Sequence, residues 1–289
     1  MVYTEFLEGD DPWVHLAVEE TRFEALQPGD RALLFYVNRP CVVLGKHQNP
    51  LREVRFGELA TRKLPLLRRS SGGGTVYQDL GNLNYSFLWA GEGFDKQALL
   101  GLVAEALNGL GRPVQLTAQG DLVVPAGTGF AKVSGTASQL RRDRALVHGT
   151  LLCSADLEHL HGVLGPTGEL VEWVGVSSRP QPVTNLGLEL REAATAITRQ
   201  WELHLAPVAP VAGAVAAPAT GADAVLRHET SLRSHAWTFD RTPPFTWRGD
   251  TRQGDLTARV EDGRIVEAAN LSRMVGKSFF SSEFFDVFD

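Results

Sequence analysis

An alanine- and proline-rich stretch at residues 206–223 divides the sequence into two parts of unequal length. It reads APVAPVAGAVAAPATGAD, and its prolines and glycines interrupt any helical or alternating pattern of apolar residues. Such a composition is typical of a linker. We therefore expect a large domain at residues 1–205, a linker at 206–223 and a small α+β domain at 224–289. On such a tether the small domain could swing to close a site on the large one.

The overall composition is that of a folded protein and excludes several classes of function. The chain has 289 residues, of which 43% are hydrophobic and 21% charged. Its net charge of −6 lacks the basic excess of a nucleic-acid-binding protein. Only two cysteines occur, without CxxC spacing, which argues against a disulfide framework or a zinc site. With no signal-like N-terminus and no long apolar run, we expect a cytoplasmic protein without membrane or nucleic-acid partners.

Local signals place most helices and strands. Asp11 and Pro12 form a helix-start signal, and the helix is expected to continue to about Leu26. Asp95 is expected to cap a second helix that ends near Gly111. The remaining expectations are strands at 32–37, 41–44 and 144–153, a hairpin with arms 121–124 and 130–140, helices after Asp156 and near 190–201, and a hairpin turn at Asp262-Gly263.

The stretch Arg68–Asn82, RRSSGGGTVYQDLGN, has the composition of an anion-handling loop. Gly72, Gly73 and Gly74 offer backbone N–H groups without side chains that would keep an oxyanion at a distance. Arg68 and Arg69 add guanidinium groups suited to phosphate or carboxylate. On these residues alone, a glycine-rich hairpin with solvated arginines remains the alternative.

Lys132 lies between small and apolar residues in the segment AKVSGTA. A lysine in such a strand is either an edge residue that faces water or a functional cation, and the residue alone does not decide between them. A further polar residue, His148, begins the segment HGTLL in the expected strand 144–153.

These three segments, in this order, resemble lipoate–protein ligase A, a family that adenylates lipoate and transfers it to a lysine of a carrier domain. Three further segments are similar to the same family: LLFYVNRPCVVLGKHQNP at 33–50, VSSRPQPVTNL at 176–186 and WTFDRTPPFTW at 237–247. The resemblance implies an α+β fold in which a mixed β-sheet is flanked by helices, as in biotin ligases, with a small α+β accessory domain at the C-terminus.

The resemblance also implies a set of site residues. Lys132 takes the position of the catalytic lysine, and the expected contacts of ATP and lipoyl-AMP are Arg69, Gly74, Thr75, Val76, Tyr77 and Lys132. Supporting positions are Gly72, Gly73, Asp79, Asn82, Ser134, Gly135 and His148. The chain departs from the family pattern at Lys46, where arginine is common, and at Gln119-Gly120, where an Arg-Asn pair is common. We expect Arg69, Gly74 and Lys132 to converge on one pocket.

The implied reaction needs ATP, Mg²⁺ and lipoate or octanoate, and it modifies apo lipoyl carrier domains such as the 2-oxoacid dehydrogenase E2 component or the glycine cleavage H protein. Asp121 is our candidate ligand for Mg²⁺. One alternative is an octanoyl or lipoyl transferase, which passes the acyl group through a cysteine thioester. Cys41 and Cys153, however, lie in expected buried strands, where a thiol is inert. A non-catalytic lipoyl-adenylate-binding protein is the other alternative.

Overall fold

The computed structural model describes residues 1–205, 221–251, 254–269 and 272–281. The chain forms two compact units, each built from three separate segments. Unit 1 contains residues 1–41, 78–157 and 180–229, and unit 2 contains residues 42–77, 158–179 and 230–289, as far as they are described. The predicted linker falls mainly on residues 206–220, which lie outside the described residues.

Unit 1 is organised around a five-stranded mixed sheet with the strand order β1-β2-β6-β11-β10. Only β1 and β2 are parallel, and the other neighbours are antiparallel. The long central strands β6 and β11 pair from Arg144↔Ala90 to Leu152↔Asn82. The strands are β1 (Val2–Phe6), β2 (Arg31–Tyr36), β6 (Asn82–Ala90), β10 (Thr136–Leu140) and β11 (Arg144–Leu152).

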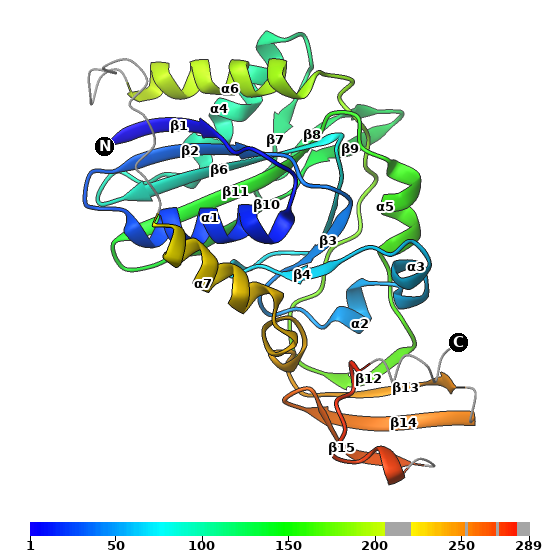
Figure 1. Cartoon of the computed structure of the whole chain (residues 1–289). Coiled ribbons are helices and arrows are strands. Elements are labelled where there is room, and N and C mark those ends of the chain that lie inside the picture. The colour runs from blue at the N-terminus through cyan, green and yellow to red at the C-terminus, as the bar shows by residue number, and fades with distance from the viewer. Residues whose placement is uncertain (206–220, 252–253, 270–271, 282–289) are drawn as a thin grey trace. The chain divides into compact units, whose positions relative to one another are not determined.

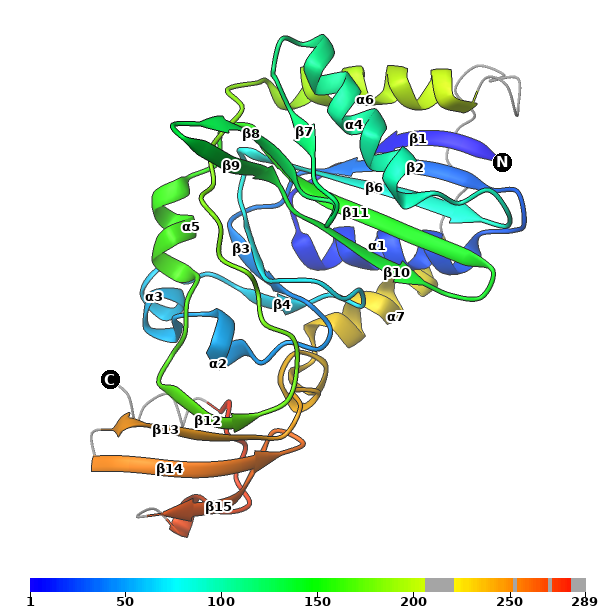
Figure 2. The same ribbon diagram turned by 180° about the vertical axis from the view of Figure 1, so that it is seen from behind.

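Helices cover both faces of this sheet (Figures 1 and 2). Helix α1 (Pro12–Ala25) packs on one face, and α4 (Lys96–Gly109) and α6 (Leu190–Leu205) pack on the other. The larger core lies on the α4 and α6 side, around fully buried side chains such as Phe87 and Trp201. A smaller core beneath α1 contains Phe23 and Leu88. The expected mixed sheet with flanking helices is confirmed.

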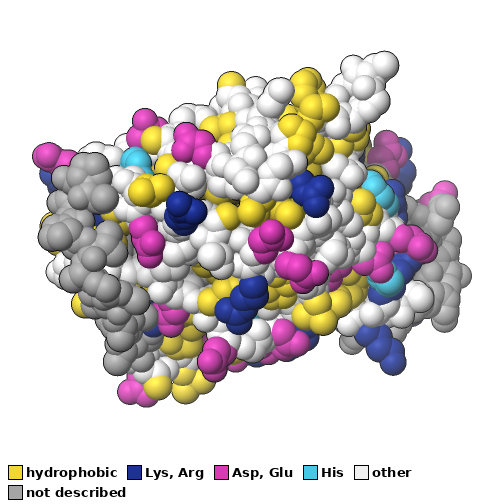
Figure 3. Space-filling model, turned by 90° about the horizontal axis from the view of Figure 1, so that it is seen from above, with side chains coloured by type: hydrophobic (Ala, Val, Ile, Leu, Met, Phe, Trp, Pro, Cys, Tyr) yellow, Lys and Arg dark blue, Asp and Glu magenta, His cyan; other side chains and the backbone are white. Residues whose placement is uncertain are grey.

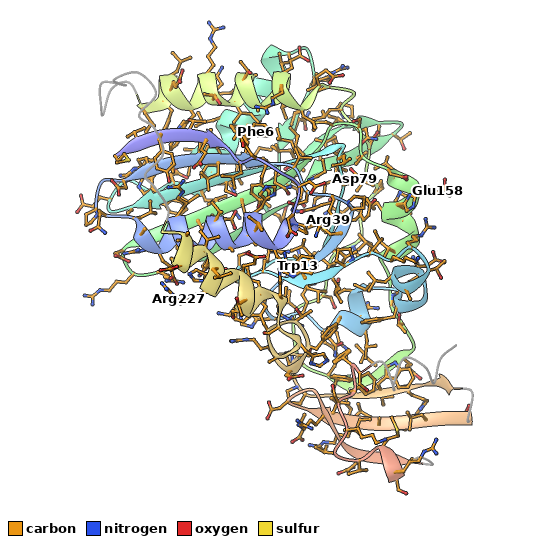
Figure 4. The ribbon with its side chains drawn as sticks, in the orientation of Figure 1. Phe6, Trp13, Arg39, Asp79, Glu158 and Arg227 are labelled. Atoms are coloured by element: carbon orange, nitrogen blue, oxygen red, sulfur yellow. The ribbon has the colours of Figure 1, made fainter. Side chains whose placement is uncertain are left out.

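The predicted helix starts are confirmed at the level of single hydrogen bonds. The Asp11 carboxylate accepts the N–H groups of Trp13 and Val14, at 3.0 and 3.3 Å. Its other oxygen accepts from the Arg39 guanidinium at 2.8 Å, so Arg39 and Trp13 lie at the same end of α1 (Figure 4). Asp95 caps α4 in the same way, through the N–H groups of Gln97 and Ala98. These caps satisfy N–H groups that have no partner within the helix.

A second sheet of unit 1 contains β7 (Gln115–Leu116), β8 (Leu122–Ala126) and β9 (Gly129–Ser134). The predicted hairpin is therefore present, with Lys132 in its second arm. The predicted arm 130–140, however, is two strands in different sheets, because the chain leaves β9 at Gly135 and enters β10. The Gly135 carbonyl accepts the Thr150 N–H at 3.0 Å, which fixes this crossing point against β11.

Unit 2 contains a three-stranded sheet with the order β4-β3-β5, in which β3 and β4 are parallel. Its elements from the first half of the chain are β3 (Cys41–Leu44), α2 (Pro50–Glu53), α3 (Phe56–Thr61), β4 (Leu66–Arg68), β5 (Val76–Gln78) and α5 (Leu157–Val163). The loop between β4 and β5 is the glycine stretch that stands out in the sequence.

The C-terminal residues of unit 2 form a four-stranded sheet with the order β12-β13-β14-β15. Its elements are β12 (Glu169–Trp173), β13 (Phe245–Thr251), β14 (Gly254–Glu261) and β15 (Arg264–Ala269), with η1 (Ala236–Asp240) and η2 (Ser272–Met274) beside them. The hairpin at Asp262-Gly263 is present, and both residues have positive φ. Helix α7 (Ala222–Arg233) carries residues of both units.

Strand β12 comes from the first 205 residues, yet it pairs with β13 from the C-terminal part. The core of this sheet also includes Leu51 and Phe56, which pack with Phe245, Trp247 and Phe279. The C-terminal residues therefore share one sheet and one core with earlier segments of unit 2. The predicted domain boundaries at 205 and 224 stay a prediction.

The surface seen in Figure 3 carries acidic and basic side chains interspersed with apolar ones. Within the described part of the chain, no helix has both the length and the apolar character that a membrane crossing requires.

Candidate functional site

The glycine loop of unit 2 packs closely on the turn that follows β3. Gly73 has a φ of +84°, a conformation that glycine adopts without strain. A Cβ atom at Gly45 would overlap the Gly73 carbonyl oxygen. Position 45 therefore requires glycine, because the loop backbone occupies the space of a side chain there.

The Arg69 guanidinium holds the loop from inside. It donates to the carbonyl oxygens of Gly72 and Gly74 at 2.6 and 2.7 Å, to the Val43 carbonyl at 3.2 Å and to Ser71 Oγ at 2.9 Å. Only 5% of its surface is exposed. Arg69 thus turns two loop carbonyls toward itself, which shapes the loop. Its predicted contact with the nucleotide stays a prediction.

Arg68 is a structural residue of unit 2. Its guanidinium is fully buried and donates to the carbonyl oxygens of Gly45, Gln48 and Thr238, at 3.1, 2.8 and 2.8 Å. Burial lowers the pKa of Arg68 to about 10, so the group still carries its charge at neutral pH. The second arginine of the sequence pair therefore lies at the glycine loop, and the first fixes the turn before α2.

Thr75 ends the loop and is fixed by two side chains that the sequence analysis did not single out. Its N–H donates to Ser178 Oγ at 2.8 Å, and its hydroxyl donates to Gln48 Oε1 at 2.8 Å. The Gln48 amide donates in turn to Ser178 Oγ at 3.1 Å. Both residues lie in segments that resemble the ligase family, but only the structure shows that they converge on Thr75. Val76 and the buried Tyr77 follow at the start of β5.

Gly45→Ala should displace the glycine loop. A backbone carbonyl cannot yield as a flexible side chain does, so we expect the free energy of unfolding to fall by about 1–3 kcal/mol. Urea denaturation measures this loss. Gly57→Ala in α3 is the matched control, because a Cβ there meets no atom within 4 Å. Equal stability of the Gly45 and Gly57 variants would contradict the close packing of this loop.

Lys132 in unit 1 is fixed through both its backbone and its side chain. Its N–H donates to the Pro182 carbonyl at 2.7 Å, and its carbonyl accepts the Thr184 N–H at 3.1 Å. The ammonium lies 2.8 Å from Asp121 Oδ1. Its stem passes over Gly135, where an added Cβ would lie 3.0 Å from Lys132 Cε. The predicted catalytic lysine is therefore an ordered cation, 25% exposed, on a strand of the hairpin.

Asp121, the predicted magnesium ligand, has the Lys132 ammonium as its partner. Among the described residues, no group of three or more His, Cys, Asp or Glu side chains is arranged to hold a metal ion. A lone carboxylate already paired with a cation does not make a metal site by itself. The magnesium role of Asp121 therefore stays a prediction.

A buried polar group lies on the face of the five-stranded sheet that α1 covers. The His148 Nδ1 atom is 3.0 Å from the Glu19 carboxylate, which also accepts hydrogen bonds from the hydroxyls of Ser86 and Tyr36. Burial by itself raises the pKa of Glu19, but the His148 charge and these hydrogen bonds bring it below its ordinary value. Glu19 was not predicted, and only its place within the apolar pattern of helix 12–25 could have indicated burial.

Glu19→Gln should reduce stability most at neutral pH. A carboxyl whose pKa is lowered on folding stabilises the folded state above its ordinary pKa, and this contribution disappears as the pH falls through the folded value. We expect a loss of about 1.5–3 kcal/mol at pH 7, in line with hydrogen bonds to a charged group. Urea unfolding at pH 7 and at pH 4 measures it, with the exposed Glu92→Gln as control. A loss that grows toward pH 4 would contradict the lowered pKa.

The other supporting residues of unit 1 have structural partners. Asp79, labelled in Figure 4, accepts the N–H groups of Gly81 and Asp156 at 2.9 and 2.7 Å. Ser134 Oγ lies 3.1 Å from the buried Tyr85 hydroxyl. Asn82 is fully buried and donates from its side-chain amide to Asn84 Oδ1 at 3.2 Å, whereas its own Oδ1 atom has no hydrogen-bond partner among the described residues.

The predicted site residues thus fall into two sets. Lys132, Asp121, Ser134 and Gly135 lie together in unit 1, which also contains Asp79, Asn82 and His148. Arg69, the three glycines and the segment 75–77 lie together in unit 2. The two sets belong to different units, and their convergence on one pocket stays a prediction.

Residues 11–200 match the family model described as the lipoyl protein ligase A/B catalytic domain. The chain belongs to this family. The match includes both sets of site residues, so the resemblance seen in the sequence and the expectation of a ligase enzyme are confirmed.

Solved structures of lipoate ligases share the fold. A bi-partite lipoate protein ligase from Thermoplasma acidophilum is 22% identical, with a TM-score of 0.65 over 82% of this chain and 95% of that one. LipL1 of P. falciparum in complex with lipoate is 18% identical, with a TM-score of 0.68 over 92% and 83%. A lipoate-protein ligase A bound with ATP is 25% identical, with a TM-score of 0.59 over 70% and 85%.

Both cysteines of this family member are inaccessible. Cys41 and Cys153 are fully buried. Burial raises the pKa of the Cys41 thiol, and it raises that of Cys153 to about 12. Both thiols are therefore protonated at neutral pH, and a protonated buried thiol is a poor nucleophile.

Proposed function

We propose that this chain is an ATP-dependent lipoate–protein ligase. In the first half-reaction, a carboxylate oxygen of lipoate attacks the α-phosphorus of ATP. The new O–P bond gives lipoyl-AMP, and the α–β phosphoanhydride bond breaks to release pyrophosphate. In the second, the amine of a carrier lysine attacks the acyl carbonyl. An amide forms, AMP leaves with the bonding electron pair, and the amine loses a proton.

The first half-reaction brings two anions together, and fixed cations must offset their repulsion. In a partly dry site this repulsion amounts to several kcal/mol at a separation of about 4 Å. We assign this role to Lys132, with its ordered ammonium, and to the N–H groups of the glycine loop that Arg69 shapes. Electrostatic stabilisation by donors that are already in place is the largest single contribution in many enzymes. The proposed reaction requires both sets of residues to act on the same reactants.

The single observation that favours a ligase over a transferase is the burial of both cysteines. A transferase of this family needs a thiolate that forms a thioester with the acyl group. This chain has two cysteines in all, and both are buried with raised pKa values. A ligase needs no protein nucleophile, because ATP activates the acyl group. The buried thiols therefore support the ligase.

Mg²⁺ enters this proposal as part of the substrate MgATP. Magnesium is commonly held by phosphate oxygens and water, with one or two carboxylates at most. The residues around Asp121 do not fit a separate protein-built metal site, since its carboxylate is paired with Lys132.

The acceptor we propose is an apo lipoyl domain, such as that of a 2-oxoacid dehydrogenase E2 component or the glycine cleavage H protein. The T. acidophilum ligase was studied together with its E2 lipoyl domain. LipL1 was solved in complex with lipoate, and the lipoate-protein ligase A was solved with bound ATP. These pairings support the same substrates for this chain. Octanoate shares the carboxylate and the eight-carbon chain, so it competes as a substrate.

Mass measurement of an apo lipoyl domain incubated with the protein, ATP, Mg²⁺ and lipoate tests the proposal. We expect the domain to gain one lipoyl group, and only when ATP is present. The variant with Cys41→Ala and Cys153→Ala should retain this activity. Transfer without ATP from an octanoyl carrier, lost in the cysteine-free variant, would instead identify a transferase. Binding of lipoyl-AMP with neither ligation nor lipoate-dependent ATP–pyrophosphate exchange would identify a non-catalytic binding protein.

A further inference from the structure

We propose that Asp121 is a positioning residue for Lys132, and that a tight turn at residues 117–121 holds its carboxylate in place for this purpose. This inference rests on the proposed function and extends it, because it assigns Asp121 to the orientation of the reacting cation and not to metal binding. Asp121, Lys132 and the residues that hold them all lie within unit 1.

The turn fixes the backbone of Asp121 from three directions. The Asp121 N–H donates to Thr117 Oγ1 at 3.0 Å, and the Thr117 N–H donates back to the Asp121 carbonyl at 2.9 Å. Gly120 closes the turn with a φ of +93°, and its carbonyl accepts the Thr136 hydroxyl at 2.9 Å. A Cβ at position 120 would lie 2.9 Å from Thr136 Oγ1, so glycine is required here.

This turn accounts for glycine at position 120, where the family commonly has asparagine. Any side chain at position 120 would begin with a Cβ 2.9 Å from Thr136 Oγ1, at a φ of +93° that residues with side chains rarely adopt. Gly120 has a positive φ, and its carbonyl accepts the Thr136 hydroxyl. Together these two residues fix the position of Asp121. The result is an aspartate held by backbone geometry, 15% exposed.

The cation is fixed in a complementary way. Pro182 and Thr184 bond both backbone groups of Lys132, while Gly135 leaves room for its stem. The Asp121 carboxylate then binds the end of a side chain that has four rotatable bonds. Gln181 donates to the other carboxylate oxygen at 3.4 Å, from the segment that also binds the Lys132 backbone. Both partners of the ion pair are therefore anchored before any substrate arrives.

The number of donors on the ammonium fits this role. A lysine ammonium has three N–H groups. Among the described residues, Asp121 is the one carboxylate paired with Lys132, which uses one of these groups. Two remain for the two anions of the first half-reaction, the lipoate carboxylate and the α-phosphate of ATP. Asp121 thus orients the two donors that act on the reactants without touching the reactants itself.

The charge of Asp121 separates this role from simple structural support. A fixed negative charge beside the reaction centre disfavours anionic substrates, while the orientation of Lys132 favours the transition state. Asp121→Asn should therefore lower kcat for lipoate-dependent ATP–pyrophosphate exchange by on the order of 10–100-fold, since small misplacements of a reacting group have effects of this size. The KM for lipoate should stay unchanged or fall. A variant that is merely unstable would not combine a lower kcat with a lower KM for lipoate.

The experiment compares Asp121→Asn, Asp121→Glu and the exposed control Asp143→Asn in the full chain. We expect Asp121→Glu to recover part of kcat and Asp143→Asn to match the wild type. In a double-mutant cycle, Asp121→Asn should add no further loss to Lys132→Ala, because it acts through that lysine. Additive losses, an unchanged kcat, or a raised Mg²⁺ requirement in Asp121→Asn would overturn the proposal, the last in favour of a metal ligand.

A readout without catalysis separates failure of this inference from failure of the proposed function. The ¹³C-methyl NMR signal of dimethylated Lys132 reports on its surroundings. It should move in Asp121→Asn and stay in place in Asp143→Asn. Suppose that the wild type shows no lipoate-dependent exchange but that the Lys132 signal still moves in Asp121→Asn. This result would refute the proposed ligase function and would support the ion pair between Asp121 and Lys132. Normal lipoate-dependent exchange with no movement of the Lys132 signal in Asp121→Asn would refute the positioning role of Asp121 and would leave the proposed ligase function in place.

Discussion

Replacement of Lys132 by alanine should lower lipoate-dependent ATP–pyrophosphate exchange by about 10²–10³-fold, the usual effect of removing a fixed donor from the site where charge develops. In the proposed reaction this ammonium opposes the repulsion between a carboxylate and a phosphate. Its loss therefore raises the barrier of the chemical step. Binding of lipoate, measured separately by calorimetry, should persist, because the alanine leaves the rest of the unit in place.

The variant is expected to fold, which makes the activity loss interpretable. Lys132 is 25% exposed, and its strand is held by backbone bonds to Pro182 and Thr184 that alanine also makes. Lys63→Ala, an exposed lysine outside any strand, is the matched control. Exchange at the wild-type rate in Lys132→Ala would remove the catalytic lysine from the proposal, and with it the predicted role of this segment.

The sequence predicted those elements whose signals are local. Asp11 and Asp95 are capping residues followed by helix-forming segments, and each caps a helix in the structure. Asp262-Gly263 is a two-residue turn between alternating apolar residues, and it joins β14 to β15. In each case, residues a few positions apart determine the element, so inspection of the sequence suffices.

Contacts between distant segments could not be predicted in this way. The pairing of β12 with β13 joins residues about 75 positions apart, and no turn signal connects them. The strand change at Gly135 is similar, because residues 130–140 read as one strand until Thr150 binds the Gly135 carbonyl. Apolar patterns indicate that a strand is buried but do not identify its neighbour.

The candidate site shows the same limit at the level of side chains. Resemblance to a family supplied Arg69, Lys132 and His148 as site residues, but it did not supply their partners. Arg69 binds carbonyl groups of its own loop, and His148 binds the buried Glu19. A charged residue type restricts the chemistry that a site can perform, whereas its partner depends on the folded backbone.

Removal of residues 206–289 should unfold much of unit 2, a larger effect than the loss of a mobile lid. The predicted linker suggests a small domain on a flexible tether that swings to close a site on the large domain. In the structure, the C-terminal residues complete the sheet that begins with β12 and the core that contains Leu51 and Phe56. Their removal exposes these two side chains, each of which contributes about 1.5–3 kcal/mol when buried.

The buried arginine increases the loss. Arg68 donates to the Thr238 carbonyl and to the Thr242 hydroxyl, both in the part that is removed. It also binds the turn at Gly45 on which the glycine loop packs. A buried donor left without its partner costs about 1–3 kcal/mol, and more when it is charged. The combined loss is a large fraction of the 5–15 kcal/mol by which a typical domain is stable.

Amide hydrogen exchange followed by mass spectrometry distinguishes the two cases. In the chain truncated after Leu205, we expect protection to fall in residues 42–77 and 169–173, while strands β6 and β11 of unit 1 stay protected. Activity should be lost together with this protection. Full protection of residues 42–77 with loss of activity alone would favour an independent lid. The shared core argues against that outcome, because a segment that supplies nine of the eleven buried residues of a cluster cannot leave without exposing the other two.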